Sequence, residues 1–423
     1  MTTLTDPPKE SFRLGMLIYD SRYRSITIQV AALIAFLIGM GWIVSNTMNN
    51  LASLGKEIDF GFLKEPASYD INQRLIEYTS RDTHARAAFI GLLNTLLVAV
   101  LGCVLATIIG VFVGVLRLSK NWLVGRVMTV YVEALRNVPT LLWIVFLMAI
   151  ITETLPAPRD FKSGEAEMLL GGTVAVTNRG TYIPEPVFSY SLGNIKLLEG
   201  FYNNSFRFEV SLDLIVILCV LIGGILISGL IKRRADRVQA ATGDRPKTWH
   251  LRLAVVVLPT VFVLWLLGLF FVVPEIKGFN FRDGIHLRAS FLALWLALSF
   301  YTAAFIAEIV RAGIMAISKG QSEAAAALGL RSGRIMSLVI LPQALRVIIP
   351  PLISQYLNLT KNSSLAIAVG YMDITGTLGG ITLNQTGREL ECLLLLMLIY
   401  LTISLLISSV MNWYNERVKL TER

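Results

Sequence analysis

The feature that most constrains the fold is a series of apolar runs, several of which approach the roughly 20 residues that a helix needs to cross a bilayer. The chain has 423 residues, of which 54% are hydrophobic and only 16% are charged. Soluble domains usually carry about 25% charged residues. We therefore predict an all-α membrane protein with about eight transmembrane helices, at approximately 26–44, 89–116, 127–151, 212–231, 253–273, 289–314, 346–369 and 390–410.

The distribution of Lys and Arg predicts the topology. Basic residues are concentrated in alternate loops, with the densest group at 232–252, and the segment before the first run is also basic. By the positive-inside rule these segments are cytoplasmic, which places both termini in the cytoplasm. The net charge of +9 then reflects the inner loops, and nucleic acid is not expected as a partner. The first run is long, starts late and lacks a small-residue cleavage site, so we expect no cleavable signal peptide.

The sequence offers no catalytic or metal-binding constellation. The three cysteines, Cys103, Cys219 and Cys392, all lie inside apolar runs, and the three histidines are scattered. Disulfide or metal use is therefore not expected. Gly-x-x-x-x-Gly-Lys-Ser/Thr, Gly-x-Ser-x-Gly and His-Glu-x-x-His motifs are all absent from the sequence. We expect a chain without enzymatic activity of its own and without a bound cofactor.

The segment 318–342 is polar enough to lie outside the membrane, yet it has helical signals. Ser318 and Gln321 have capping-box spacing, and an alanine-rich run follows. Gly329 is placed to end this helix in the left-handed conformation, Ser332 to cap a second short helix, and Pro342 to limit it. The predicted helix–turn–helix has apolar faces with no lipid beside them. Such faces usually mark a partner surface; the alternative is an ordinary amphipathic turn.

Polar residues inside the seventh apolar run are the main candidates for contact with a solute. Three of them, Gln355, Asn358 and Asn362, share one helical face. Lys361 lies roughly 22 Å beyond Arg346 along a helix, deep enough to require a wet cavity or a carboxylate. We interpret these side chains as the lining of a translocation path; the alternative is hydrogen bonding between helices. The full candidate set is Gln355, Asn358, Lys361, Asn362, Ser363 and Ser364.

Two charged pairs with i, i+3 spacing lie in other apolar runs. We expect Glu133 with Arg136, and Glu308 with Arg311, to form structural ion pairs. Pro139 is expected to kink the third span.

Two further patterns concern packing and the outer surface. Gly110 and Gly114 in the second span have the spacing that lets helices approach closely, although this spacing also arises by chance. The long outer loop 152–210 contains a predicted small hairpin at 173–183, which serves either as a docking surface or as a solvated loop.

Several motifs, taken in chain order, resemble a known family. The Glu-Ala-Ala…Gly…Leu-Pro pattern of 318–342 is similar to the cytoplasmic loop of ATP-binding-cassette (ABC) importer permeases, with Val339 where Ile is usual. The other motifs resemble the permeases of polar amino acid importers (the histidine/glutamate/glutamine/arginine/opine group), with Arg136-Asn-Val-Pro139 where Arg-Gly-x-Pro is usual. The matching strings are Gly91-Leu-Leu-Asn-Thr-Leu, Tyr131-Val-Glu-Ala-Leu-Arg-Asn-Val-Pro139, Ala307-Glu-Ile-Val-Arg-Ala-Gly313, Gly320-Gln-Ser-Glu-Ala-Ala325, Pro342-Gln-Ala-Leu-Arg346 and Lys361-Asn-Ser-Ser-Leu-Ala366.

With its long N-terminal part and inserted hairpin, the chain is similar to the first permease subunit of the general L-amino acid (glutamate/glutamine/aspartate/asparagine) importers of Gram-negative bacteria. The resemblance implies a type I ABC importer permease core of five helices, plus one N-terminal helix and an inserted helical hairpin. The corresponding parts are 1–88, 89–151, 152–287 and 288–423. It also implies an ATPase-coupling loop that contains Gly320, Gln321, Glu323, Ala324, Ala325, Gly329, Leu341 and Pro342.

The same resemblance implies the partners and the location. They are a second, homologous permease subunit in a heterodimer, two ATP-binding subunits that hold the ATP and Mg²⁺, and a periplasmic amino-acid-binding protein, at the bacterial inner membrane. Three alternatives stay open at this point. They are a secondary transporter driven by an ion gradient, a membrane scaffold or sensor that transports nothing, and an ABC permease for another small polar solute.

Overall fold

A computed structural model describes residues 16–53, 55 and 58–418, and they fall into two compact units divided between Phe60 and Gly61. The described part of the first unit holds α1 (Met16–Tyr19) and α2 (Ser21–Ser53). The apolar part of α2, Tyr23–Ser53, is long enough to cross a membrane, as predicted for the first span.

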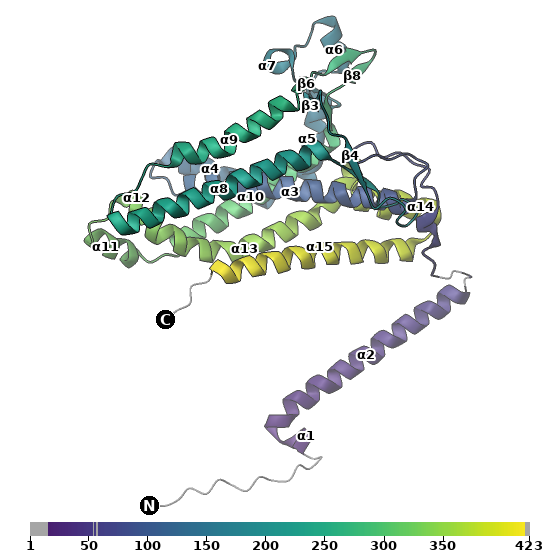
Figure 1. The fold of residues 1–423 in the computed structure, drawn as a ribbon. Coiled ribbons are helices and arrows are strands. Elements are labelled where there is room, and N and C mark those ends of the chain that lie inside the picture. The colour runs from purple at the N-terminus through teal and green to yellow at the C-terminus, as the bar shows by residue number, and fades with distance from the viewer. Residues whose placement is uncertain (1–15, 54, 56–57, 419–423) are drawn as a thin grey trace, which may run out of the picture. The chain divides into compact units, whose positions relative to one another are not determined.

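The second unit is a bundle of long helices with short helical turns and strands at its ends (Figure 1). Its long helices are α3 (His84–Leu116), α4 (Trp122–Asn137), α5 (Thr140–Thr154), α8 (Leu212–Thr242), α9 (Trp249–Leu266), α10 (Ala289–Met315), α13 (Leu341–Asn362) and α15 (Glu389–Val418). The short ones are η1 (Gly61–Lys64), α6 (Pro158–Ser163), α7 (Leu169–Gly172), α11 (Lys319–Ala327), α12 (Ser332–Ile335), η2 (Met336–Ile340), η3 (Ser363–Val369), η4 (Thr375–Thr382) and α14 (Leu383–Thr386). Across both units, eight helical segments of the described chain are long and apolar enough to span a membrane.

Helix α10 is the centre of the bundle. Its most apolar window is 61% buried, whereas the other candidate spans reach 33% at most. It packs against α3, α4, α5 and α13, and the main core cluster is formed between these helices, with Leu294, Leu298 and Ile306 of α10 fully buried.

The predicted close approach at Gly110 and Gly114 of α3 is confirmed. A Cβ atom at Gly110 would lie 2.6 Å from Cβ of Ile306, and one at Gly114 would lie 2.7 Å from the carbonyl oxygen of Ala307. Both neighbours belong to α10, so the two glycines let the backbones of α3 and α10 meet without side chains between them.

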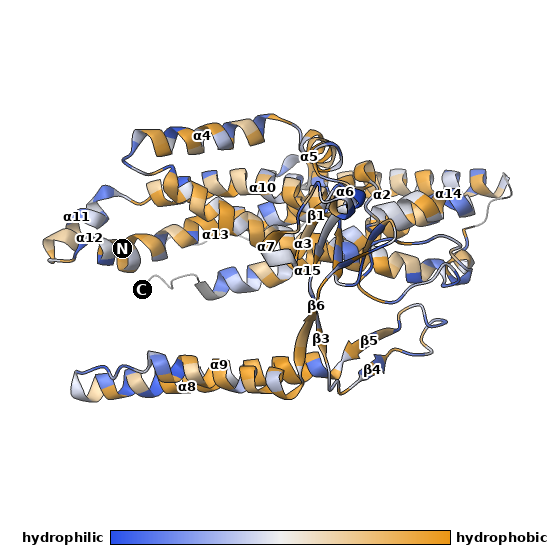
Figure 2. Cartoon of the chain, turned by 90° about the horizontal axis from the view of Figure 1, so that it is seen from above, coloured by the Kyte–Doolittle hydropathy of each residue, from blue (hydrophilic) through white to orange (hydrophobic). Residues whose placement is uncertain are grey.

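The third predicted span, 127–151, is not one helix. Helix α4 ends at Asn137, Val138 is extended (φ −109°, ψ 135°), and α5 begins at Thr140 after Pro139. Proline disfavours the helical conformation in the residue before it and donates no hydrogen bond, so the expected kink is a complete break. The candidate spanning segment is Thr140–Ser163, and α4 and α5 run in different directions (Figure 2).

The inserted hairpin differs from its predicted bounds at both ends. Helix α8 continues eleven residues past the predicted end at Ile231, through the basic residues, and stops at Gly243 (φ 82°). The Lys, Arg, Ala and Gln residues of this extension are good helix formers. Helix α9 ends at Leu266 and not at Val273, because the β-branched and aromatic run that follows forms a strand.

Helices α8 and α9 pack mainly on each other. The backbone of Val255 lies against Gly224, and Nε of Arg252 donates to the hydroxyl of Ser228 at 3.2 Å. Figure 2 shows this strongly apolar pair lying apart from the other long helices and joined to them through β3 and β6.

The strands form small antiparallel sheets in the loops. They are β1 (Ala175–Thr177), β2 (Gly180–Ile183), β3 (Glu185–Phe188), β4 (Asn194–Leu197), β5 (Phe208–Ser211), β6 (Leu269–Val272), β7 (Glu275–Lys277), β8 (Asn280–Arg282) and β9 (Ile285–Arg288). The predicted hairpin at 173–183 is confirmed as β1–β2, but β2 also pairs with β9, which makes a three-stranded sheet that no local pattern indicated.

Candidate functional site

Helices α11 and α12 lie at one end of the bundle, between α10 and α13 (Figure 1). Ala325 and Ile335 are buried, but Leu328 is 82% exposed. The other predicted coupling residues are also exposed: Gly320, Gln321, Glu323, Ala324, Gly329, Leu341 and Pro342. The predicted helix–turn–helix is therefore present, and it offers an open surface that carries apolar side chains.

The predicted side-chain caps of this segment are wrong, whereas its glycine turn is confirmed. Neither Ser318 at the start of α11 nor Arg331 at the start of α12 makes a capping hydrogen bond through its side chain, and Ser332 is already the first residue of α12. Gly329 has φ +79°, and its N–H donates to the carbonyl oxygen of Ala326 at 2.9 Å. The left-handed glycine thus defines the turn, as such residues do at helix ends.

Pro342 does not end the second helix of this segment. From Ser332 the helical path continues through the π-turn η2 into α13, and Pro342 is the second residue of α13, directly after this π-turn. Nε2 of Gln343 also donates to Oε1 of Gln321 at 3.4 Å. The helix–turn–helix is therefore linked directly to the seventh span.

A charged cluster ties α3 to α10 just before this segment. Glu308 accepts from Nη2 of Arg311 at 2.5 Å, which confirms the predicted pair, and it also binds Nη1 of Arg117 at the end of α3. The Arg117 side chain is only 8% exposed. Because Arg117 comes from another helix, the i, i+3 spacing in the sequence revealed only the Glu308–Arg311 half of this cluster. Because α10 leads into α11, the cluster fixes the base of the helix–turn–helix.

The predicted Glu133–Arg136 pair is absent from the described residues. Glu133 accepts a hydrogen bond from Nδ2 of Asn137 at 3.3 Å instead. The guanidinium of Arg136 lies 5.2 Å from the ring centre of Phe305 on α10, in a cation–π contact. Spacing alone could not show this, because the aromatic partner comes from a distant helix.

The polar residues of α13 fall on different parts of its circumference. Asn358 and Lys361 are exposed, Gln355 and Asn362 are half-buried, and Ser363 is buried at the start of η3. At about 100° per residue, Ser354, Asn358 and Lys361 share one open face. Amide and ammonium groups at membrane depth avoid lipid, so this face requires a wet cavity or another subunit.

Ser363 and Ser364 are less available than the sequence suggested. Their hydroxyls donate to the carbonyl oxygens of Thr360 (2.7 Å) and Lys361 (2.8 Å), within the same helical path. The opposite side of α13 is held by Tyr356, whose hydroxyl lies 2.7 Å from Oγ1 of Thr107 on α3. Of the candidate set, Asn358 and Lys361 are therefore the two that face outward.

The sequence analysis missed Asp373, a fully buried carboxylate between the last two spans. Its oxygens accept from the backbone N–H of Gly376 at 2.8 Å and from the hydroxyl of Tyr400 at 3.3 Å. Burial raises the pKa of Asp373 to about 7. Asp373 stabilises the turn before η4. In the sequence its only signal was that it is an isolated acidic residue in a Gly/Thr-rich segment.

Comparisons with known proteins place the chain in a family. Residues 243–420 match the family described as binding-protein-dependent transport system inner membrane component. The chain is 57% identical, over 100% of both chains, to the glutamate/glutamine/aspartate/asparagine transport system permease protein BztB of Rhodobacter capsulatus. It is 44% identical to the general L-amino acid transport system permease protein AapQ of Rhizobium johnstonii, over 98% of this chain and 96% of the relative. It is also 42% identical to the putative amino-acid ABC transporter permease protein YhdX of Escherichia coli, over 95% of each.

These matches extend over nearly the whole of both chains and include the helix–turn–helix between α10 and α13. With its eight candidate spans, the chain is a multi-pass inner-membrane protein and belongs to the family of inner-membrane components of binding-protein-dependent transport systems.

Proposed function

We propose that this chain is the permease subunit of an ATP-driven importer for polar L-amino acids, with glutamate, glutamine, aspartate and asparagine as its substrates. The observation that carries the proposal is the 57% identity over the full length of a permease named for these four amino acids. ATP and Mg²⁺ bind to two separate ATPase subunits, and a periplasmic protein delivers the substrate.

The exposed helix–turn–helix supports the coupling part of the proposal. Glu323 and Leu328 lie on its open surface, and Gln321 contacts the start of α13 through Gln343. When the ATPase subunits close, they move α11 and α12, and this motion passes to α10 and α13. In this arrangement the end of the bundle that carries α11 and α12 is cytoplasmic, as are both termini.

The open face of α13 supports the part of the proposal that concerns the translocation path. We assign Asn358 and Lys361 to a lining that is completed by a second, homologous permease in a heterodimer. Lys361 attracts a substrate carboxylate, and Asn358 offers both a donor and an acceptor, so acids and amides pass by the same route. Gln355 and Asn362 lie at the edge of this face and contribute less.

The test is uptake of labelled glutamate by proteoliposomes that contain this chain, its partner permease, the ATPase subunits and the binding protein. We expect uptake to require ATP and to be abolished by Glu323→Lys. The matched control is Glu416→Lys, the same charge reversal at an exposed position near the end of α15. Uptake that continues without ATP, or that is equal in Glu323→Lys, would contradict the proposal and favour transport driven by an ion gradient.

A further inference from the structure

Helix α8 ends in a group of exposed cations that have no partner inside the described chain. They are Lys232, Arg233, Arg234 and Arg237, which we call the α8 cation cluster. No described residue forms an ion pair or a hydrogen bond with any of these side chains. The carboxylate beside them on the helix, Asp236, is already paired with Arg245 at 2.7 Å.

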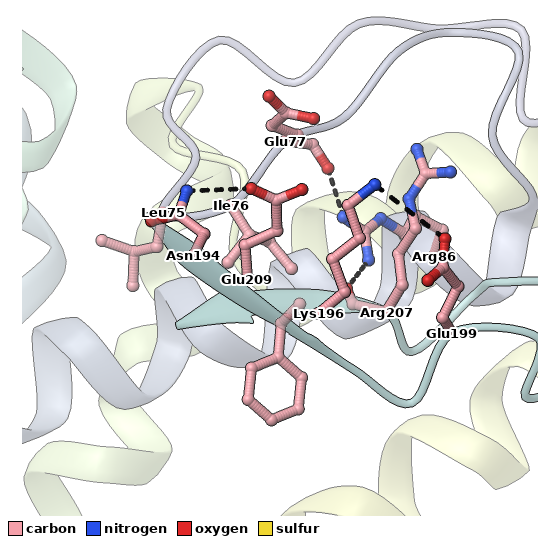
Figure 3. A pocket seen from close by; sticks show the side chains of 10 residues that line it. Leu75, Ile76, Glu77, Arg86, Asn194, Lys196, Glu199, Arg207 and Glu209 are labelled. Carbon is pink, nitrogen blue, oxygen red and sulfur yellow. Dashed lines mark hydrogen bonds and ion pairs between the residues drawn. The ribbon is translucent and has the colours of Figure 1, made fainter. Parts of the chain in front are cut away.

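The cations at the start of α3 are different, because the protein itself supplies their partners. Figure 3 shows Arg86 between the backbone carbonyl oxygens of Glu77 and Arg207, to which its terminal nitrogens donate. In the same view Nζ of Lys196 lies 4.0 Å from Oε1 of Glu199. The α8 cation cluster has no internal partners of this kind, so it is open to an external anion.

The α8 cation cluster lies at the depth of the lipid headgroups. The apolar part of α8, 212–231, is about 30 Å long at 1.5 Å per residue, which equals the thickness of the hydrocarbon core of a bilayer. The headgroup layer beyond this core is about 5–8 Å thick in each leaflet. Because α8 stays helical as far as Thr242, Arg233 and Arg237 lie about 3 Å and about 9 Å past residue 231. The cluster therefore spans the headgroup layer.

The cluster also continues the lipid-exposed face of α8. Leu226 and Leu230 are 65% and 61% exposed. At about 100° per residue, Arg233 and Arg237 follow them on the same stripe of the helix. Ala235, by contrast, is 2% exposed and lies on the face that α9 covers. The two arginines therefore point away from α9, towards the lipids whose acyl chains cover Leu226 and Leu230.

An exposed tryptophan marks the same depth on α9. Arg252 of α9 donates to the hydroxyl of Ser228 on α8, so these two positions lie at one level of the antiparallel pair. Three residues nearer the loop, Trp249 on α9 lies level with residue 231 on α8. Trp249 is 61% exposed. Because exposed tryptophan is typical of the boundary between the hydrocarbon core and the headgroups, it places this boundary at residue 231 independently of the length of α8.

The surroundings of α8 and α9 favour a lipid over a protein as the partner of the cluster. The most apolar windows of α8 and α9 are only 6% and 0% buried. Figure 2 shows the pair lying apart from the other long helices. The positive-inside rule explains why a loop here is basic, but it does not require the cations to follow the lipid-exposed face at headgroup depth.

We propose that the α8 cation cluster is a binding site for anionic phospholipid, with the lipid phosphate held by Arg233 and Arg237. Guanidinium groups form strong charge-assisted hydrogen bonds with phosphate. A zwitterionic lipid carries a cation of its own beside the phosphate, so the cluster selects phosphatidylglycerol over phosphatidylcholine. The site concerns the lipids around the chain and stands whether or not the chain transports amino acids.

The experiment measures the binding of single lipids to the full-length chain. The delipidated chain in neutral detergent is titrated with phosphatidylglycerol or phosphatidylcholine, and native mass spectrometry gives the Kd of the first bound lipid. Each Lys or Arg near an anionic lipid is worth about fivefold in the association constant. The triple variant Arg233→Gln/Arg234→Gln/Arg237→Gln should therefore raise the Kd of phosphatidylglycerol at least about tenfold and leave that of phosphatidylcholine unchanged.

The matched control removes the same charge from another surface. Arg159, Lys162 and Arg282 are exposed on α6 and β8, and their triple replacement by Gln should leave the Kd of phosphatidylglycerol unchanged. A second variant guards against a loss of binding that comes from misfolding. Asp236→Asn removes the carboxylate that pairs with Arg245 and leaves one more cation beside the cluster. It should lower the Kd of phosphatidylglycerol about fivefold.

Three results would overturn the proposal. The first is an equal Kd of phosphatidylglycerol in the unchanged chain and in the α8 triple variant, which would leave the cations with a role in topology alone. The second is displacement of phosphatidylglycerol by inorganic phosphate beyond the effect of sodium chloride at the same ionic strength, which would assign the site to a free phosphate. The third is an α8 triple variant that keeps its lipid selectivity but no longer retains the ATPase subunits, which would make the cluster a protein contact.

Discussion

Replacing Gly114 of α3 by alanine should destabilise the bundle, although alanine is the better helix former. The new Cβ would lie 2.7 Å from the carbonyl oxygen of Ala307 and 2.9 Å from Cβ of Val310, closer than real Cβ contacts, so α3 and α10 must separate. Overpacking of this kind costs about 1–3 kcal/mol. The gain from removing a glycine inside a helix is about 1 kcal/mol, so the net loss is up to about 2 kcal/mol.

The matched control variant should change the stability in the opposite direction. Gly223 lies in the middle of α8 with no atom within 4 Å of a built Cβ, so Gly223→Ala should leave stability unchanged or raise it by up to about 1 kcal/mol. The variants are ranked by thermal unfolding of the purified chain in nanodiscs. The measured quantity is the temperature at which the monodisperse peak is lost. Gly110→Ala should behave like Gly114→Ala, and the double variant should fall short of the sum because both face one interface. A Gly114→Ala protein as stable as Gly223→Ala would refute the argument that backbone contact holds α3 against α10.

Two further predictions concern ionisable groups. Glu308→Gln should lower the free energy of unfolding by about 2 kcal/mol, less than for a fully buried pair, because Glu308 is 26% exposed. The control Asp236→Asn breaks the exposed pair with Arg245 and should cost under about 1 kcal/mol. Equal thermal midpoints for the two variants would contradict this prediction. Burial lowers the pKa of His286 below 6.5, so the unfolded chain binds a proton first, and the stability present above pH 6.5 is lost as the pH falls towards the folded pKa. Asp373, whose pKa burial raises to about 7, acts in the opposite direction over this range, so the test compares two chains. Between about pH 7.5 and 5.5 the thermal midpoint of the unchanged chain should fall relative to that of His286→Phe, which keeps the ring stacked on Tyr182.

Features that depend on local chemistry were predictable from the sequence. Apolar length located the spanning helices, α10 almost to the residue, and Gly329 fixed the turn of the helix–turn–helix. The pairing of Glu308 with Arg311 was also readable, since both lie on one helix within reach. In each case the partners are close in the chain, so spacing alone defines the contact.

Features that depend on distant partners were not predictable. Arg117 completes the Glu308 cluster from another helix, and Phe305 draws Arg136 away from Glu133. The break at Pro139 was expected only as a kink, because its sharpness depends on how α4 and α5 each pack on α10. The site residues of α13 stay a prediction for the same reason: their open face needs a partner that lies outside this chain.

Helices α3 and α10 are in contact but far apart in the sequence, and this has a consequence for biosynthesis. Arg117 and Glu308, which join the two helices, are 191 positions apart, so α3 leaves the ribosome long before its central partner exists. During that interval its glycine face and Arg117 lack the helix that they contact in the finished fold. Helices α8 and α9 are made in the meantime and close on each other through Gly224 and Ser228. The hairpin can therefore enter the bilayer as a finished pair, without competing for the place that α10 will take.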